Sequence, residues 1–210
     1  MPGPIRIADT TMTVYVDHNA RRKLILDTAF SLFAQEGYDG VTYQKIAESC
    51  NISRTTIYKY FKDKEQIFNY AIHQATERIS STIQKVMNRI DLAPDAKIKR
   101  ILHLTLKLLA ENHVFLTVVL DYLITQKAAG SNVRRIVRRH TFGMKILLSR
   151  LVRDASALRL FRPVDPEMAA GRLYGLLESY VMNLTVLDAM DRKDCQFLID
   201  DAINDMCPIL

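Results

Sequence analysis

Apolar residues recur every three to four positions along most of the chain, the spacing typical of amphipathic helices. The first such stripe runs over about 20–36 and ends at Gly37, a residue type that commonly ends helices. Two short helices are predicted next, over about 42–50 and 53–61, and a long one over 64–90. Later stripes predict helices over about 95–111, 114–128, 132–158, 166–189 and 192–206. No strand pattern is evident, so the sequence predicts an all-α fold of about nine helices.

Capping chemistry marks the predicted helix starts. Thr42, Ser53 and Asp63 each stand just before a stripe, where a side-chain oxygen can accept a hydrogen bond from the first turn. The two short helices are joined by Cys50-Asn51-Ile52-Ser53, and a turn this tight needs a residue with positive φ. Asn51 suits that conformation better than most residues other than glycine. The spacing is that of a helix-turn-helix unit.

The second short helix has two chemically different faces. At about 100° per residue, Ile57, Tyr60 and Phe61 point to one side and are expected to face inward. The other side presents no acid, and Thr56 lies at its margin. Arginine can pair with guanine, while hydroxyls and cations reach phosphates, so this face predicts contact with DNA. The plainer alternative is a solvated polar surface on a small helix. The outward side chains are Arg54, Thr55, Tyr58, Lys59 and Lys62.

Charge and composition narrow the class of protein. The 210 residues carry a net charge of +6, but residues 165–210 hold nine acids and three bases, so only the N-terminal part suits a polyanion. The three cysteines form no CxxC pair, which argues against a disulfide scaffold or a zinc site and fits a reducing cytoplasm. No enzyme motif is found and no apolar run reaches membrane-spanning length. We therefore expect a cytoplasmic protein without catalytic activity, cofactor or metal.

Residues 21–72 resemble the DNA-binding domain of tetracycline-repressor-type (TetR) transcriptional regulators. The resemblance implies that Gln44 and Arg54 read bases. It implies phosphate or mixed contacts for Thr42, Tyr43, Thr55, Thr56, Tyr58, Lys59, Tyr60 and Lys64. The family's usual turn Gly, the Ala before it, and an early Gly or Pro in the recognition helix are replaced here by Asn51, Cys50 and Thr55. The last change leaves the operator sequence open. The matching segments are Ile25–Ala29, Leu32–Tyr38, Val41–Thr42, Ile46–Ala47, Ile52–Ser53 and Ile57–Glu65.

The resemblance also implies how the chain is divided. We expect a flexible arm over 1–19, a helix-turn-helix domain over 20–66, and a helical ligand-binding and dimerisation domain over 67–210. The arm has a single Arg6, so a basic arm reading the minor groove is unsupported. Polar or aromatic candidates for a ligand pocket are His103, His113, Phe115, Tyr122, Gln126, Tyr174 and Glu178. Candidates for a four-helix interface between two copies are Leu173, Leu177, Tyr180, Val181, Leu184, Phe197 and Ile203.

The predicted function is a homodimeric, sequence-specific transcriptional repressor that binds a (pseudo)palindromic double-stranded operator and is released by a small-molecule effector. Two alternatives remain open at this stage: a DNA-binding adaptor or architectural protein without ligand sensing, and a helical ligand carrier. A basic run, Arg134 to Arg139, also has several readings: a solvated face, a site for an anionic effector, or a second phosphate-binding surface.

Overall fold

The computed structural model describes residues 18–187 and 191–208, and the side chains of these residues except those of 134–142. Within these ranges the chain forms nine α-helices and one π-helical turn, without a strand, which confirms the all-α prediction. The helices are α1 (His18–Gly40), α2 (Tyr43–Ser49), α3 (Arg54–Tyr58), α4 (Lys64–Met87), α5 (Pro94–Glu111), α6 (His113–Ala128), α7 (Val133–Ala157), α8 (Pro166–Met182) and α9 (Arg192–Asn204), with the π-helical turn at Asn183–Leu187.

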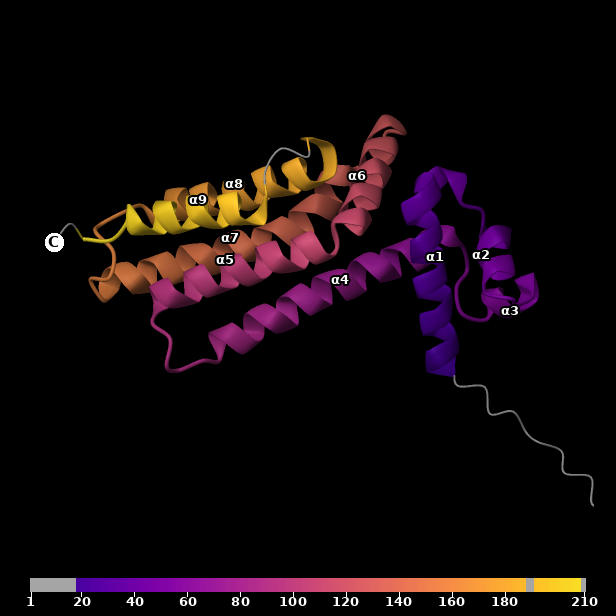
Figure 1. The fold of residues 1–210 in the computed structure, drawn as a ribbon, viewed down its shortest axis with the longest axis horizontal. Coiled ribbons are helices and arrows are strands. Elements are labelled where there is room, and N and C mark those ends of the chain that lie inside the picture. The colour runs from indigo at the N-terminus through magenta and orange to yellow at the C-terminus, as the bar shows by residue number, and fades with distance from the viewer. Residues whose placement is uncertain (1–17, 188–190, 209–210) are drawn as a thin grey trace, which may run out of the picture.

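The molecule is elongated, with a small helical head at one end (Figure 1). Helices α1, α2 and α3 form the head, and α4 runs from it along a bundle made by α5, α7, α8 and α9. Helix α6 stands steeply at the junction and packs against α1. In the bundle, α7 packs against both α8 and α5, and α9 packs against α5 and α8.

Local hydrogen bonds explain where the helices begin. Thr42 accepts from the backbone N–H of Lys45 at 3.1 Å, and Ser53 accepts from that of Thr56 at 3.1 Å. Asp63 caps α4 and Asp165 caps α8 in the same way, through first-turn N–H groups. Each predicted cap is therefore confirmed. The positive φ predicted for Asn51 is also confirmed, at 52°, whereas Gly37, with a φ of 71°, marks a kink within α1 and not its predicted end.

Several helix ends differ from the predicted ones. Helix α3 stops at Tyr58, because the chain then tightens: Lys59 N–H donates to the Thr56 carbonyl at 3.1 Å instead of continuing the α-helical pattern. Helix α4 ends at Met87, three residues early, and α9 ends at Asn204, two residues early. Helix α8 ends at Met182 and passes into the π-helical turn. The predicted arm lies outside the described residues, except that 18–19 already belong to α1.

Two separate hydrophobic cores organise the structure. The head core joins buried residues of α1, α2, α3 and the start of α4 to Phe115, Val118 and Tyr122 of α6. The bundle core is built mainly from aliphatic residues of α5, α7, α8 and α9. Because the head core continues through Ala71 and recruits α6, it extends past residue 66, where the sequence predicts the end of the domain.

One further observation concerns length and apolarity. Among the described residues, no single helix is long and apolar enough to cross a membrane. In the same part of the chain, α5 and α6 taken together reach that length and composition, and the pair is bent by 81°.

Candidate functional site

The outward face of α3 is exposed as its sequence predicts. Arg54, Thr55, Tyr58 and Lys59 are exposed, while Ile57 is fully buried in the head core. The Arg54 guanidinium lies 5.9 Å from the centre of the Tyr58 ring, and its Nη2 lies 3.4 Å from the Tyr58 hydroxyl. The predicted division of this helix into an inner and an outer face is therefore confirmed. Thr56 is half-buried, with its hydroxyl 2.8 Å from that of Ser53.

Two tyrosines near this face use their hydroxyls inside the head. The Tyr43 hydroxyl donates to the backbone carbonyl of Phe61, and burial, with smaller effects of Tyr58 and Asp63, raises the pKa of Tyr43 to about 12. The Tyr43 and Tyr58 rings lie 4.8 Å apart. The Tyr60 hydroxyl lies 3.3 Å from Nδ1 of His18. Tyr43 therefore ties α2 to the segment that follows α3.

Lys64 occupies a different place from the one the resemblance implies. Its ammonium donates to the backbone carbonyl of Tyr38 at 2.7 Å and lies 4.2 Å from the centre of the Tyr38 ring. Burial lowers the pKa of Lys64, and the nearby Asp39 opposes that shift. The side chain thus joins α4 to the end of α1, and a phosphate contact stays a prediction that would require it to turn outward.

A hollow of about 520 Å³ opens between α2 and α3. Gln44 and Glu48 line it from one helix turn to the next, and the amide Nε2 of Gln44 donates to Oε1 of Glu48 at 2.8 Å. The sequence reasoning missed Glu48, although residues four apart on a helix lie on one face. The side chains around the hollow are those of Thr42, Tyr43, Gln44, Lys45, Glu48 and Arg54.

A cavity of about 870 Å³ lies between α4 and the bundle helices. Its walls from α5, α6 and α7 are chiefly leucine and methionine, whereas α4 contributes a polar stripe. The size and the apolar lining with a few polar groups are typical of small-molecule sites. The lining comprises His73, Thr76, Glu77, Ile79, Ser80, Ile83, Gln84, Thr105, Leu109, Leu116, Leu120, Leu123, Gly143, Met144, Leu147, Tyr174, Leu177, Glu178, Val181 and Met182.

Two of the seven predicted ligand residues line this cavity. Tyr174 and Glu178 stand one turn apart on α8, and burial together with the Glu178 carboxylate raises the pKa of Tyr174 to about 12. Lys145 of α7 places its ammonium 4.7 Å from the centre of the Tyr174 ring. The sequence reasoning missed the polar stripe of α4. Its signal is the helical spacing of His73, Thr76, Glu77, Ser80 and Gln84.

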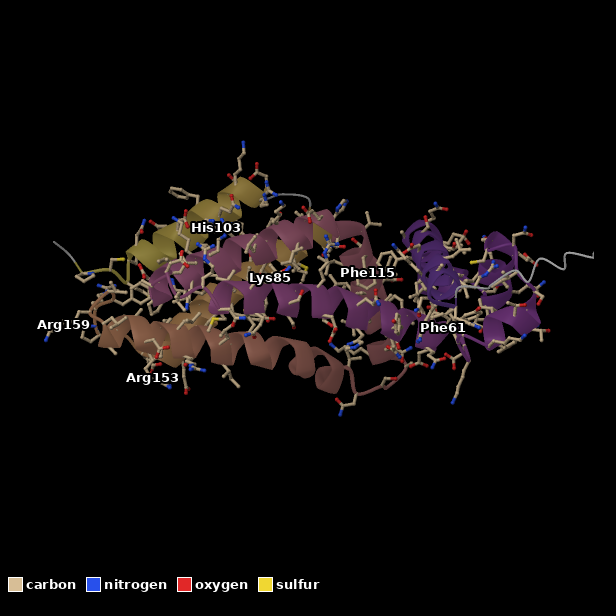
Figure 2. The ribbon with its side chains drawn as sticks, turned by 90° about the horizontal axis from the view of Figure 1, so that it is seen from below. Phe61, Lys85, His103, Phe115, Arg153 and Arg159 are labelled. Atoms are coloured by element: carbon tan, nitrogen blue, oxygen red, sulfur yellow. The ribbon has the colours of Figure 1, made fainter. Side chains whose placement is uncertain are left out.

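The other five predicted ligand residues lie elsewhere. Phe115 and Tyr122 are buried in the head core, which corrects their assignment to the pocket. His103 bonds to Asp200 of α9 at 2.8 Å, His113 is exposed, and Gln126 accepts from Ser131. Figure 2 shows Phe115 beside the head and His103 on the bundle. The reason is that an aromatic stripe on α6 faces α1, whereas the leucines of α6 face the cavity.

The predicted interface residues divide into buried and surface positions. Four of them, Leu173, Leu177, Tyr180 and Ile203, are buried within the protomer at 6% exposure or less, so they cannot form the surface that a second copy would meet. This corrects their assignment. Val181 and Leu184 are half-buried, and Phe197 is 70% exposed. The apolar surface residues of α8, the π-helical turn and α9 are Met168, Met182, Val186, Leu187, Phe197 and Leu198.

Two sets of residues complete the survey. The side chains of Arg134, Arg135, Arg138 and Arg139 lie outside the described residues, although their backbone belongs to α7. In the part of the chain that is described, no group of three or more His, Cys, Asp or Glu side chains could hold a metal ion. The three cysteines are free thiols, and burial raises the pKa of Cys195 to about 11.

Comparisons with known proteins agree with the head geometry. The family model described as "Bacterial regulatory proteins, tetR family" matches residues 25–71, which cover α2, α3 and the adjoining parts of α1 and α4. A curated relative is the biofilm operon icaADBC HTH-type negative transcriptional regulator IcaR of Staphylococcus aureus. It is 32% identical over 72 residues, which are 34% of this chain and 39% of IcaR. The match thus spans about two fifths of the length of that relative.

Solved structures extend the likeness over most of the chain. A TetR transcription regulator from Haloarcula marismortui aligns with a TM-score of 0.75 and 18% identity, covering 90% of this chain and all of that one. AibR, solved in complex with isovaleryl coenzyme A and operator DNA, aligns with a TM-score of 0.64 and 18% identity, over 90% of this chain and all of that one. Identities this low show a shared fold. The likeness to the tetR family of bacterial regulatory proteins therefore rests on sequence in residues 25–71 and on fold alone over the rest of the chain.

Proposed function

We propose that the chain is a sequence-specific DNA-binding transcriptional repressor that works as a homodimer and leaves its operator when a small molecule fills the cavity. The observation that carries this proposal is the outer face of α3. There, Arg54, Thr55, Tyr58 and Lys59 are exposed on a short helix that contains no acid. These side chains supply the guanidinium, hydroxyl and ammonium groups that contact base edges and phosphates.

The cavity supports ligand sensing because two helices border both it and the head. On α6, Leu116, Leu120 and Leu123 face the cavity, while Phe115 and Tyr122 pack into the head core. Helix α4 similarly gives Phe68 to the head core and lines the cavity from His73 onward. A ligand that shifts either helix would move the head with it. Allosteric coupling of about 1–3 kcal/mol is usual and would change operator affinity roughly 5–150-fold.

The dimer is proposed from exposed apolar residues of α8 and α9. Met168 and Phe197 are at least 70% exposed and belong to the helices α8 and α9, which pack against each other. Covering them with the same surface of a second copy gives two-fold symmetry. The two α3 helices would then need a separation of about 34 Å to enter successive major grooves of DNA.

The relatives support repression rather than activation. IcaR is named a negative regulator, and AibR was solved with both an acyl-coenzyme A and operator DNA. The cavity favours this function over that of an adaptor that binds DNA without sensing. Because its partner is DNA, the proposed regulator acts in the cytoplasm.

The test is selection of bound sequences from random double-stranded DNA by the full chain. We expect one motif with two inverted half-sites about one helical turn apart, and a mass in solution of two chains. A compound library is then screened for release of that motif. Binding to all DNA equally would exclude a sequence-specific regulator. If no compound that binds the cavity releases the protein from the motif, the result would favour an adaptor that binds DNA without sensing a ligand.

A further inference from the structure

Glu48 is an acid on a surface that is otherwise suited to DNA. It is exposed at the end of α2 and lines the hollow that Arg54 lines from α3. Among the described residues, its carboxylate has no ion-pair partner, because the nearest base on its own helix, Lys45, pairs with Glu36 of α1 at 2.6 Å. On a surface that contacts DNA, an unpaired carboxylate repels the phosphates and weakens binding to DNA of any sequence. A role in recognising the DNA sequence would offset this loss of affinity.

The contact that Glu48 makes is directed at another polar side chain of the hollow. Oε1 of Glu48 accepts from Nε2 of Gln44 at 2.8 Å. A carboxylate can only accept hydrogen bonds. The NH₂ group of the Gln44 amide, and not its oxygen, must therefore face Glu48. Among the described residues, the second N–H of Gln44 and its carbonyl oxygen make no further hydrogen bond. A glutamine presents one donor and one acceptor to adenine, whose N7 accepts and whose N6 donates in the major groove.

We propose that Glu48 is a positioning residue that locks the Gln44 amide for recognition of adenine at one position of each operator half-site. Glu48 thus determines specificity while lowering affinity for DNA in general. The inference rests on the proposed function, since it concerns how the same surface chooses its sequence. A solvated surface acid would instead change affinity alone.

The experiment compares Glu48→Ala, Glu48→Gln and Gln44→Ala in the full-length protein. Each variant is titrated with the selected operator and with copies in which the A·T pair read by Gln44 is replaced by G·C. In the wild type we expect the A·T operator to bind about tenfold more tightly than the G·C copy. Glu48→Ala should bring that ratio close to one and, by removing the charge, raise affinity for both DNAs.

The conservative variant separates charge from hydrogen bonding. Glu48→Gln keeps a side-chain oxygen that can accept from Gln44, so the preference for A·T should survive while affinity for both DNAs rises. Gln44→Ala should abolish the preference, and adding Glu48→Ala to it should not change the ratio further. Glu111→Ala is the control, because it removes an exposed acid from α5, outside the head. It should leave both affinities unchanged.

The outcomes are distinct. A ratio unchanged by Glu48→Ala, with affinity raised for both DNAs, would make Glu48 a simple repulsive charge and overturn the proposal. The proposal would also be overturned if Gln44→Ala changes the base preference at no position of the selected motif. If the wild-type protein selects no motif, the proposed function fails instead. Thermal unfolding of each variant shows whether a change in ratio comes with loss of the fold, and alanine at this exposed helical position favours the helix.

Discussion

The head and the bundle are packed in different ways. In the head, the Phe68 ring lies 5.4 Å from that of Phe33, 4.9 Å from that of Tyr38 and 4.7 Å from that of Tyr122. The bundle core is mainly aliphatic and borders a cavity of about 870 Å³. Interlocked rings leave few alternative arrangements, whereas leucines and methionines around a cavity can adjust to its contents. We therefore expect the head to keep its shape while the bundle adjusts to a molecule in the cavity.

The largest expected effect is in the head. Phe68→Ala should lower the free energy of unfolding by about 3–5 kcal/mol, because it removes a fully buried ring that touches several others. Urea unfolding followed by circular dichroism measures this loss. Ile90→Ala is the control, since Ile90 is fully exposed between α4 and α5 and its truncation should cost less than about 0.5 kcal/mol. Similar losses in both variants would contradict the packing described here.

A pair of leucines sharpens the contrast within the bundle. Leu102→Ala should cost about 2–5 kcal/mol, since Leu102 is fully buried in the bundle core. Leu120→Ala should cost only about 1 kcal/mol, because Leu120 is half-buried and already borders empty space. The same unfolding assay compares them. Equal costs would mean that the bundle closes around Leu120 in solution.

The next effect concerns DNA rather than stability. Arg54→Ala should weaken binding to the operator by about 1–3 kcal/mol and relax the choice of one base pair, while the fold is kept because Arg54 is exposed. Titration with the operator and with a copy changed at that base pair measures both. Arg153→Ala is the control, since Figure 2 shows Arg153 on α7, far from the head. Equal weakening on both DNAs would reduce Arg54 to a phosphate contact.

The smallest expected effect tests the cap of the recognition helix. Ser53→Ala removes the acceptor for the Thr56 N–H and should destabilise the head by about 1 kcal/mol. A shift in the urea midpoint at constant slope would report it. Ser81→Ala provides a matched change within α4, where the hydroxyl only bonds back to the Arg78 carbonyl. That variant should be neutral or slightly more stable. A Ser53→Ala protein as stable as the wild type would contradict the capping role.

Local chemistry made much of the head predictable. The caps at Thr42, Ser53 and Asp63 and the positive φ of Asn51 depend on residues within a few positions of each other. A sequence displays such short-range relations directly. The outer face of α3 was predictable for the same reason, because helical periodicity alone separates Arg54 and Lys59 from Ile57.

Long-range partners were not predictable from one sequence. Periodicity shows that Leu173 and Tyr180 lie on an apolar face, but not whether the protomer's own helices or a second copy cover it; the protomer does. Likewise, nothing near Tyr122 in the sequence says that its ring meets Tyr38, 84 positions away, with the centres 4.6 Å apart. The ammonium of Lys64 finds its acceptor 26 residues earlier in the chain. Which distant residues come into contact depends on how whole helices pack against one another.

Helix α6 contacts two parts of the molecule at the junction, because one of its faces packs against the head and another lines the cavity. Under the proposed function, a molecule retained in that space through purification would change the operator affinity of the protein being assayed. Preparations from different expression hosts are expected to differ in operator affinity, and stripping bound molecules with organic solvent before refolding should make them converge.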